Sequence, residues 1–155
     1  MFRCLPVWAM LLFSVTASAA EPELKLKRLN PSLNTLSRGE RSAVDRAVGL
    51  IRKGEHTAAL AQLTELTRAN PNNSSVRVVL AYALLQAGNL AGAFDHAKLA
   101  EAAPDHNSYV CLFLARVAWL AGDKASCRRE LGHVRAAGTD RREADDLERE
   151  LALTR

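Results

Sequence analysis

The 155-residue sequence contains few aromatic residues and cysteines: two Trp, two Tyr, four Phe and three Cys. Cys111 and Cys127 do not form a CxxC redox motif. No two histidines are separated by three or four positions, so no helix presents a histidine pair to a metal. The histidines are His56, His96, His106 and His133. The chain also lacks a glycine-rich phosphate loop and a nucleophile elbow. We therefore expect no catalytic residue, no metal site, no cofactor and no enzyme activity.

The composition is that of an ordinary globular chain, and the length fits one domain. Apolar residues make up 48% and charged residues 25%, which excludes a disordered or collagen-like protein. The 21 basic and 17 acidic residues are spread along the chain, so the net charge of +4 does not by itself indicate a nucleic-acid-binding surface. We expect no nucleic-acid partner.

Residues 1–20 have the three parts of a secretory signal peptide. Arg3 supplies positive charge, residues 5–15 form an uncharged apolar run, and residues 16–20 are small and polar. Cleavage after Ala19 or Ala20 is expected, with an uncleaved anchor or a buried helix as alternatives. Because no later apolar run reaches the length of a membrane span, we expect no stable membrane insertion after cleavage. The protein is therefore predicted to be exported, to the periplasm or beyond.

Three glycines, Gly54, Gly88 and Gly122, are spaced 34 residues apart, which indicates an internal repeat. Small residues coincide in two further columns at the same spacing. These columns are Ala47, Ala81 and Ala115, and Ala59, Ala93 and Cys127. Pro71 and Pro104 close the first two units because proline cannot continue a helix. Each unit is interpreted as two antiparallel helices that reverse at the glycine.

The apolar periodicity predicts helices at 38–53, 56–69, 74–87, 90–103, 106–121, 124–136 and 140–153, and no strand. Ser37 and Glu40 form a capping box, and Ser74 and Asp105 are expected to be N-caps. The repeat units span 38–73, 74–105 and 106–138, after a charged linker at 21–37. Residues 139–155 are expected to form a capping helix with an apolar stripe at Ala144, Leu147 and Leu151.

The 34-residue period and its small and apolar columns resemble the tetratricopeptide repeat family over residues 38–138. The second unit carries the pattern as Arg77-x-x-Leu80-Ala81-x-x-Leu84 followed by Ala93 and Pro104. The early aromatic of each unit is absent, Arg46 takes a usually apolar place, and Gly138 replaces the third proline. The resemblance implies an all-α, right-handed α-solenoid with a concave groove that holds peptides or protein surfaces.

In that architecture the first helix of each unit lines the groove, and ten residues are predicted to face it. They are Val44, Val48, Ile51, Val78, Tyr82, Leu85, Tyr109, Leu112, Arg116 and Trp119. The groove is therefore expected to be apolar, with aromatic residues and one cation. Two alternatives remain open: the leucine-bearing segment from Leu24 to Leu36 folds back over the groove, or the groove is a homodimer interface.

Antiparallel pairing across Gly122 places Cys127 opposite Ala115, with Cys111 about 6 Å further along its helix. With an interaxial distance of about 8–10 Å, the cysteines are roughly 10 Å apart. This exceeds the disulfide limit of about 7 Å, so buried thiols are expected.

The function predicted from these features is a non-enzymatic adaptor of the cell envelope that binds a peptide or amphipathic helix. A secretion chaperone of the same architecture and a structural homo-oligomer are alternatives. The groove positions carry Val, Tyr and Leu rather than Lys and Asn, so capture of a chaperone carboxylate is not expected.

Overall fold

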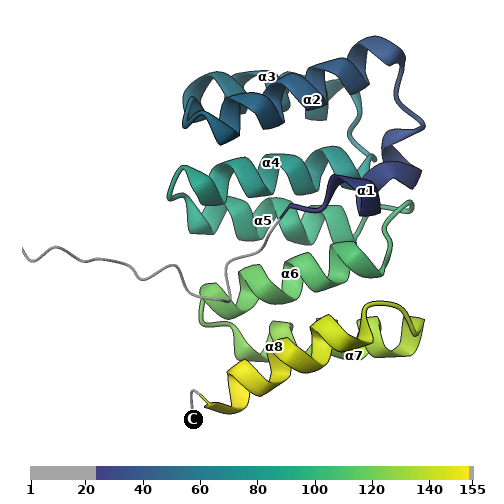
Figure 1. Ribbon diagram of the computed structural model, residues 1–155, viewed down its shortest axis with the longest axis vertical. Helices are drawn as coiled ribbons and strands as arrows, with labels where there is room; N and C mark the ends of the chain where they lie inside the picture. Colours follow the sequence, from purple (N-terminus) through teal and green to yellow (C-terminus); the bar gives the residue numbers. More distant parts are fainter. Residues whose placement is uncertain (1–23, 154–155) are drawn as a thin grey trace, which may run out of the picture.

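The computed structural model describes residues 24–153, and over that range it consists of eight α-helices without a strand. The elements are α1 (Leu26–Leu33), α2 (Arg38–Arg52), α3 (His56–Ala69), α4 (Ser74–Gln86), α5 (Leu90–Glu101), α6 (Ser108–Leu120), α7 (Lys124–Ala137) and α8 (Arg141–Leu153). Helices α2 to α7 stack as three antiparallel pairs, α2 with α3, α4 with α5 and α6 with α7, and α8 lies at the α7 end of the stack (Figure 1). The arrangement confirms the predicted all-α solenoid. The predicted signal peptide, residues 1–20, lies outside the described residues.

All seven predicted helices are present, and each boundary lies within two residues of its predicted position. The additional helix is α1, which falls inside the segment 21–37 that was predicted to be a linker. Pro31 lies within this eight-residue helix and removes one backbone donor. Leu29 and Leu33 are buried on one face of it. Because a short helix with an internal proline has little intrinsic stability, α1 depends on packing against the repeats.

The repeated glycines reverse the chain between paired helices, as predicted. Gly54, Gly88 and Gly122 have φ angles of +79°, +80° and +78°, a left-handed conformation that costs glycine least. Gly138 adopts the same conformation at the end of α7, where the other two units have a proline. The small residues of both predicted columns are completely buried, so adjacent helix backbones can approach closely.

The helix starts confirm one predicted cap and correct two. Ser37 and Glu40 form the expected capping box, and hydrogen bonds from Asn70 and then Ser37 lower the pKa of Glu40. The N-cap of α4 is Asn73 rather than Ser74, because the Asn73 side chain accepts from the amide of Val76.

The N-cap of α6 is Asn107 rather than Asp105, since Asn107 accepts from the amides of Tyr109 and Val110. Asp105 instead accepts hydrogen bonds from the backbone amide of Ser74 and from the hydroxyl of Ser32. This carboxylate therefore joins the start of α4 to the end of α1.

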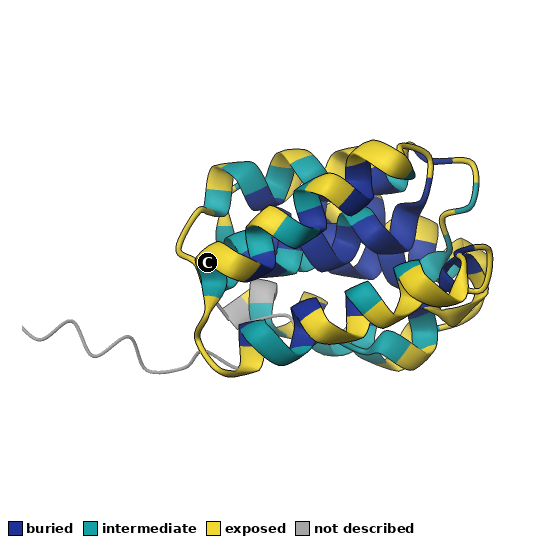
Figure 2. Ribbon diagram, turned by 90° about the horizontal axis from the view of Figure 1, so that it is seen from above, coloured by how far each residue is buried: buried dark blue, intermediate teal, exposed yellow. Residues whose placement is uncertain are grey.

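Two apolar clusters meet at α6, and opposite faces of this helix contribute to the two clusters. Phe113 and Val117 pack with α1 to α5, whereas Leu112 and Ala118 pack with α7 and α8. Buried residues lie on the inward faces of the helices and exposed residues on the outward faces (Figure 2). Because α6 belongs to both clusters, it couples the two halves of the stack.

Helix α8 covers the end of the stack, as predicted for a capping helix. Ala144 and Leu147 are completely buried, and most other described side chains of this helix are at least partly exposed. The side chain of Leu151 lies outside the described residues. Within the described range, none of the helices combines the length and apolar character needed to cross a lipid bilayer.

Candidate partner-binding face

The first helices of the units and the capping helix form one layer, in which α2 contacts α4, α4 contacts α6, and α6 contacts α8. We call the surface of this layer that carries α1 the inner face. Helix α1 lies beside the first turns of α4 and α6 (Figure 1). The segment from Leu24 to Leu36 therefore folds back over the predicted groove, which was one of the alternatives left open by the sequence.

Polar side chains at the starts of α4 and α6 bind the carbonyl groups of α1. Ser75 Oγ donates to the carbonyl of Leu29 at 2.9 Å, and Asn107 Nδ2 donates to that of Arg28 at 3.0 Å. Asn73 Nδ2 donates to the carbonyl of Ser32 at 2.9 Å. These bonds satisfy backbone acceptors of a short helix and fix its position on the repeats.

Tyr109 is the aromatic residue of the inner face that α1 covers most fully. Its side chain is only 4% exposed, and its hydroxyl accepts a 2.8 Å hydrogen bond from the backbone amide of Lys25. The guanidinium of Arg28 lies 5.6 Å from the centre of the tyrosine ring, within the range of a cation–π interaction. Tyr109 therefore holds the chain's own N-terminal segment.

Ion pairs connect α1 to the start of α8, at the far end of the stack. Lys25 Nζ lies 2.6 Å and Arg28 Nη1 3.2 Å from Glu143 Oε1. Arg28 also pairs with Asp140, whose side chain is almost completely buried. Since repeats in a solenoid normally contact only their neighbours, α1 adds a connection between the first and last parts of the chain.

The ten predicted groove residues divide into two groups. Six are buried, which differs from the open groove expected at these positions: Val44, Val48, Ile51, Val78, Tyr109 and Leu112. The cause is coverage by α1 together with close packing of the first helices on one another. Four are half-buried, namely Tyr82, Leu85, Arg116 and Trp119.

The four half-buried residues share the face of their helices that α1 contacts. Tyr82 and Leu85 follow Ser75 along α4 by seven and ten positions, and Arg116 and Trp119 follow Tyr109 along α6 by the same steps. Side chains at these steps lie on one side of a helix. We call these four residues the uncovered strip; it occupies the C-terminal halves of α4 and α6.

Sequence reasoning assigned no role to the residues that hold α1, among them Ser75, Asn107 and Glu143. The leucines at 26, 29 and 33 recur at three- and four-residue steps and were the available signal for a helix there. Pro31 and the charged neighbours of these leucines obscured that signal.

Two family models match parts of the repeat region. Family models described as tetratricopeptide repeat match residues 50–94 and residues 108–133. A solved structure of a MamA point mutant is similar to the chain at 23% sequence identity and a TM-score of 0.49, covering 72% of this chain and 80% of that one. No curated protein sequence matches the chain significantly. The repeat matches together with the stacked helix pairs show that the chain belongs to the tetratricopeptide repeat family.

Proposed function

We propose that this protein is a non-enzymatic scaffold of the cell envelope that binds an amphipathic helix or apolar peptide of another protein on its inner face. The observation that carries this proposal is α1 itself. A short helix with one apolar side is seated on the inner face through buried leucines and backbone hydrogen bonds. A face that holds one such helix has the chemistry needed to hold a second beside it.

The uncovered strip supplies the surface for that second segment. Tyr82, Leu85 and Trp119 are partly buried against the core, so each is held in place while part of its surface faces solvent. Tyrosine, tryptophan and arginine are the residue types that most often dominate binding energy. Arg116 adds a cation beside this apolar surface, which favours a partner segment that carries a carboxylate near its apolar residues.

Export is part of the proposal and rests on the three-part pattern of residues 1–20. A scaffold delivered to the periplasm or secreted would assemble other exported proteins. The residues between this signal and α1 are few, so α1 would lie close to the N-terminus of the mature chain. The N-terminal segment would then serve as a fixed part of the repeat domain.

The test is site-specific photocrosslinking in living cells with the full chain. A photoreactive residue replaces Leu85 on the uncovered strip in one variant and Leu99 in the control variant. Leu99 is the matched control because it is an exposed leucine, 49% accessible, on the outer helix α5. We expect a discrete crosslinked protein from position 85 that is absent from position 99 and is lost when Tyr82 and Trp119 are replaced by alanine.

Equal crosslinking from both positions, or crosslinking that survives both alanine substitutions, would contradict a partner site on the uncovered strip. A crosslinked species of twice the chain mass would instead assign this strip to a homo-oligomer interface.

A further inference from the structure

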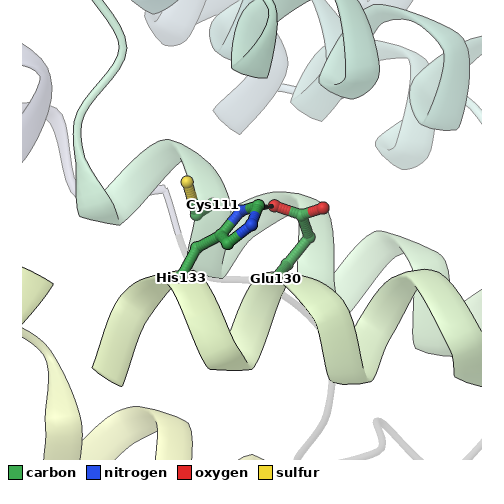
Figure 3. Close-up of side chains that lie close together, drawn as sticks. All are labelled: Cys111, Glu130 and His133. Atoms are coloured by element: carbon green, nitrogen blue, oxygen red, sulfur yellow. Dashed lines mark hydrogen bonds and ion pairs between the residues drawn. The ribbon is translucent and has the colours of Figure 1, made fainter. Parts of the chain in front are cut away.

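Three metal-binding side chains converge between α6 and α7, away from the uncovered strip. They are Cys111 on α6 and Glu130 and His133 on α7, and one ligand atom from each lies within 4.8 Å of the others. Figure 3 shows the three side chains lying close together, with the carboxylate of Glu130 beside the ring of His133. We propose that this ligand cluster binds a divalent transition-metal ion, with Zn²⁺ as the best fit.

The sequence contains a signal for this site that a search for histidine pairs does not detect. Glu130 and His133 are three positions apart, so both side chains project from one side of α7. A glutamate and a histidine at this spacing form an effective pair of metal ligands on a helix. The third ligand, Cys111, lies 19 positions before Glu130 and joins the pair only when α6 and α7 pack together.

The two oxygens of Glu130 have different partners. Oε1 lies 3.0 Å from Nε of Arg129, and Oε2 lies 3.2 Å from Nδ1 of His133. Zinc bonds to nitrogen and oxygen of about 2.0–2.1 Å in a tetrahedral arrangement place the two ligand atoms roughly 3.3 Å apart. The observed separation of the histidine nitrogen and the carboxylate oxygen is therefore already suitable. Arg129 holds the carboxylate orientation from the other side.

The sulfur of Cys111 requires only a small adjustment. A zinc–sulfur bond of about 2.3 Å places the sulfur roughly 3.6 Å from each of the other ligand atoms. The present separations do not exceed 4.8 Å, so modest rotations of the Cys111 side chain and of the exposed His133 side chain close the difference. About half of that side chain is accessible to solvent, which leaves it free to rotate.

The electrostatics of the cluster favour a cation. Cys111 and Glu130 are both buried, at 4% and 1% exposure. A bound cation attracts the thiolate and the carboxylate together, and it displaces the thiol proton.

The site is open to solvent on one side. A depression of about 410 Å³ is bordered by Cys111 and His133 together with Glu101, His106 and Ser108. It provides a path for the ion and space for a fourth ligand, which a water molecule can supply. Thiolate and imidazole ligands favour Zn²⁺ over Mg²⁺ and Ca²⁺, which prefer oxygen ligands.

The experiment measures Zn²⁺ and Co²⁺ binding to the full chain with Cys4 replaced by serine, so that two cysteines remain. We expect one Zn²⁺ per chain by calorimetry. Bound Co²⁺ should show the thiolate-to-cobalt charge-transfer absorption of a sulfur ligand. His133→Gln and Cys111→Ser should each weaken Zn²⁺ binding by at least about tenfold, because even residues that only orient ligands cost that much.

Cys127→Ser is the matched control. Cys127 is completely buried, as Cys111 nearly is, but it does not belong to the ligand cluster. This variant should bind Zn²⁺ as the parent does and should retain the cobalt band, whereas Cys111→Ser should lose it. His133→Gln changes a half-exposed residue, so its effect does not depend on whether a buried cysteine tolerates substitution.

The proposal is overturned if the parent binds no stoichiometric Zn²⁺, if the cobalt complex lacks the sulfur band, or if His133→Gln leaves the affinity unchanged. Each of these results would mean that Glu130 only pairs with Arg129 and His133 and that Cys111 is an ordinary buried thiol.

Discussion

The docking of α1 can be tested by replacing Leu29 with alanine. Leu29 has no exposed surface and packs in the larger apolar cluster. Truncation of a buried leucine to alanine costs about 2–5 kcal/mol, through lost burial and the cavity that remains. We expect the free energy of unfolding to fall by about 3 kcal/mol, measured by urea denaturation followed by circular dichroism.

The loss of stability in Leu29→Ala should exceed the loss caused by removing any single polar contact of α1. Each side-chain hydrogen bond to an α1 carbonyl contributes about 0.5–1.5 kcal/mol. Ser75→Ala, which removes the bond to the Leu29 carbonyl, should therefore cost less than Leu29→Ala. The order of the two variants tests whether apolar burial or polar contacts dominate the docking of α1.

Amide hydrogen exchange locates the effect within the chain. In Leu29→Ala, amides of residues 26–33 should exchange faster than in the parent, while those of α4 and α6 keep most of their protection. The control is Leu99→Ala, which removes the same atoms from a side chain that is 49% exposed and should change stability by no more than about 0.5 kcal/mol. If both alanine variants lose the same stability, or if residues 26–33 are unprotected in the parent, α1 is not docked as described.

Two further predictions concern the cysteines and the N-terminus. Burial raises the pKa of Cys111 and of Cys127 to about 11, so both thiols should resist alkylation at neutral pH in the folded protein and react after unfolding. Mass spectrometry of the peptides that contain them measures this reaction. Rapid alkylation of Cys127 in the native state would contradict its burial. The intact mass of the protein recovered from its native host should correspond to loss of the first 19 or 20 residues, and an unprocessed mass would exclude cleavage of the predicted signal.

Local sequence signals predicted the repeat helices because those signals act over a few residues. The glycines at 54, 88 and 122 fix the reversals through their left-handed conformation. Ser37 and Glu40 fix the start of α2 through a capping box. The N-caps at 74 and 105 were misplaced by one and two residues because neighbouring asparagines compete for the same role.

The accessibility of the inner face was predicted only in part because it depends on distant contacts. The ten residues follow the helical periodicity of the first helices, but periodicity does not show what covers them. Lys25 and Tyr109 are 84 positions apart when they form the hydrogen bond that helps to close the face. The residues left half-buried, such as Trp119, could be separated from the buried ones only after α1 was placed.

The sequence by itself determined the family, the order and boundaries of the repeat helices, and the close packing of their small residues. These properties follow from a 34-residue period and from the steric demands of glycine, alanine and proline within each unit. The tertiary structure alone decided that α1 occupies the inner face, that ion pairs connect it to α8, and that Cys111 meets Glu130 and His133. Each of these three features brings together side chains of different helices, so it forms only when the helices pack.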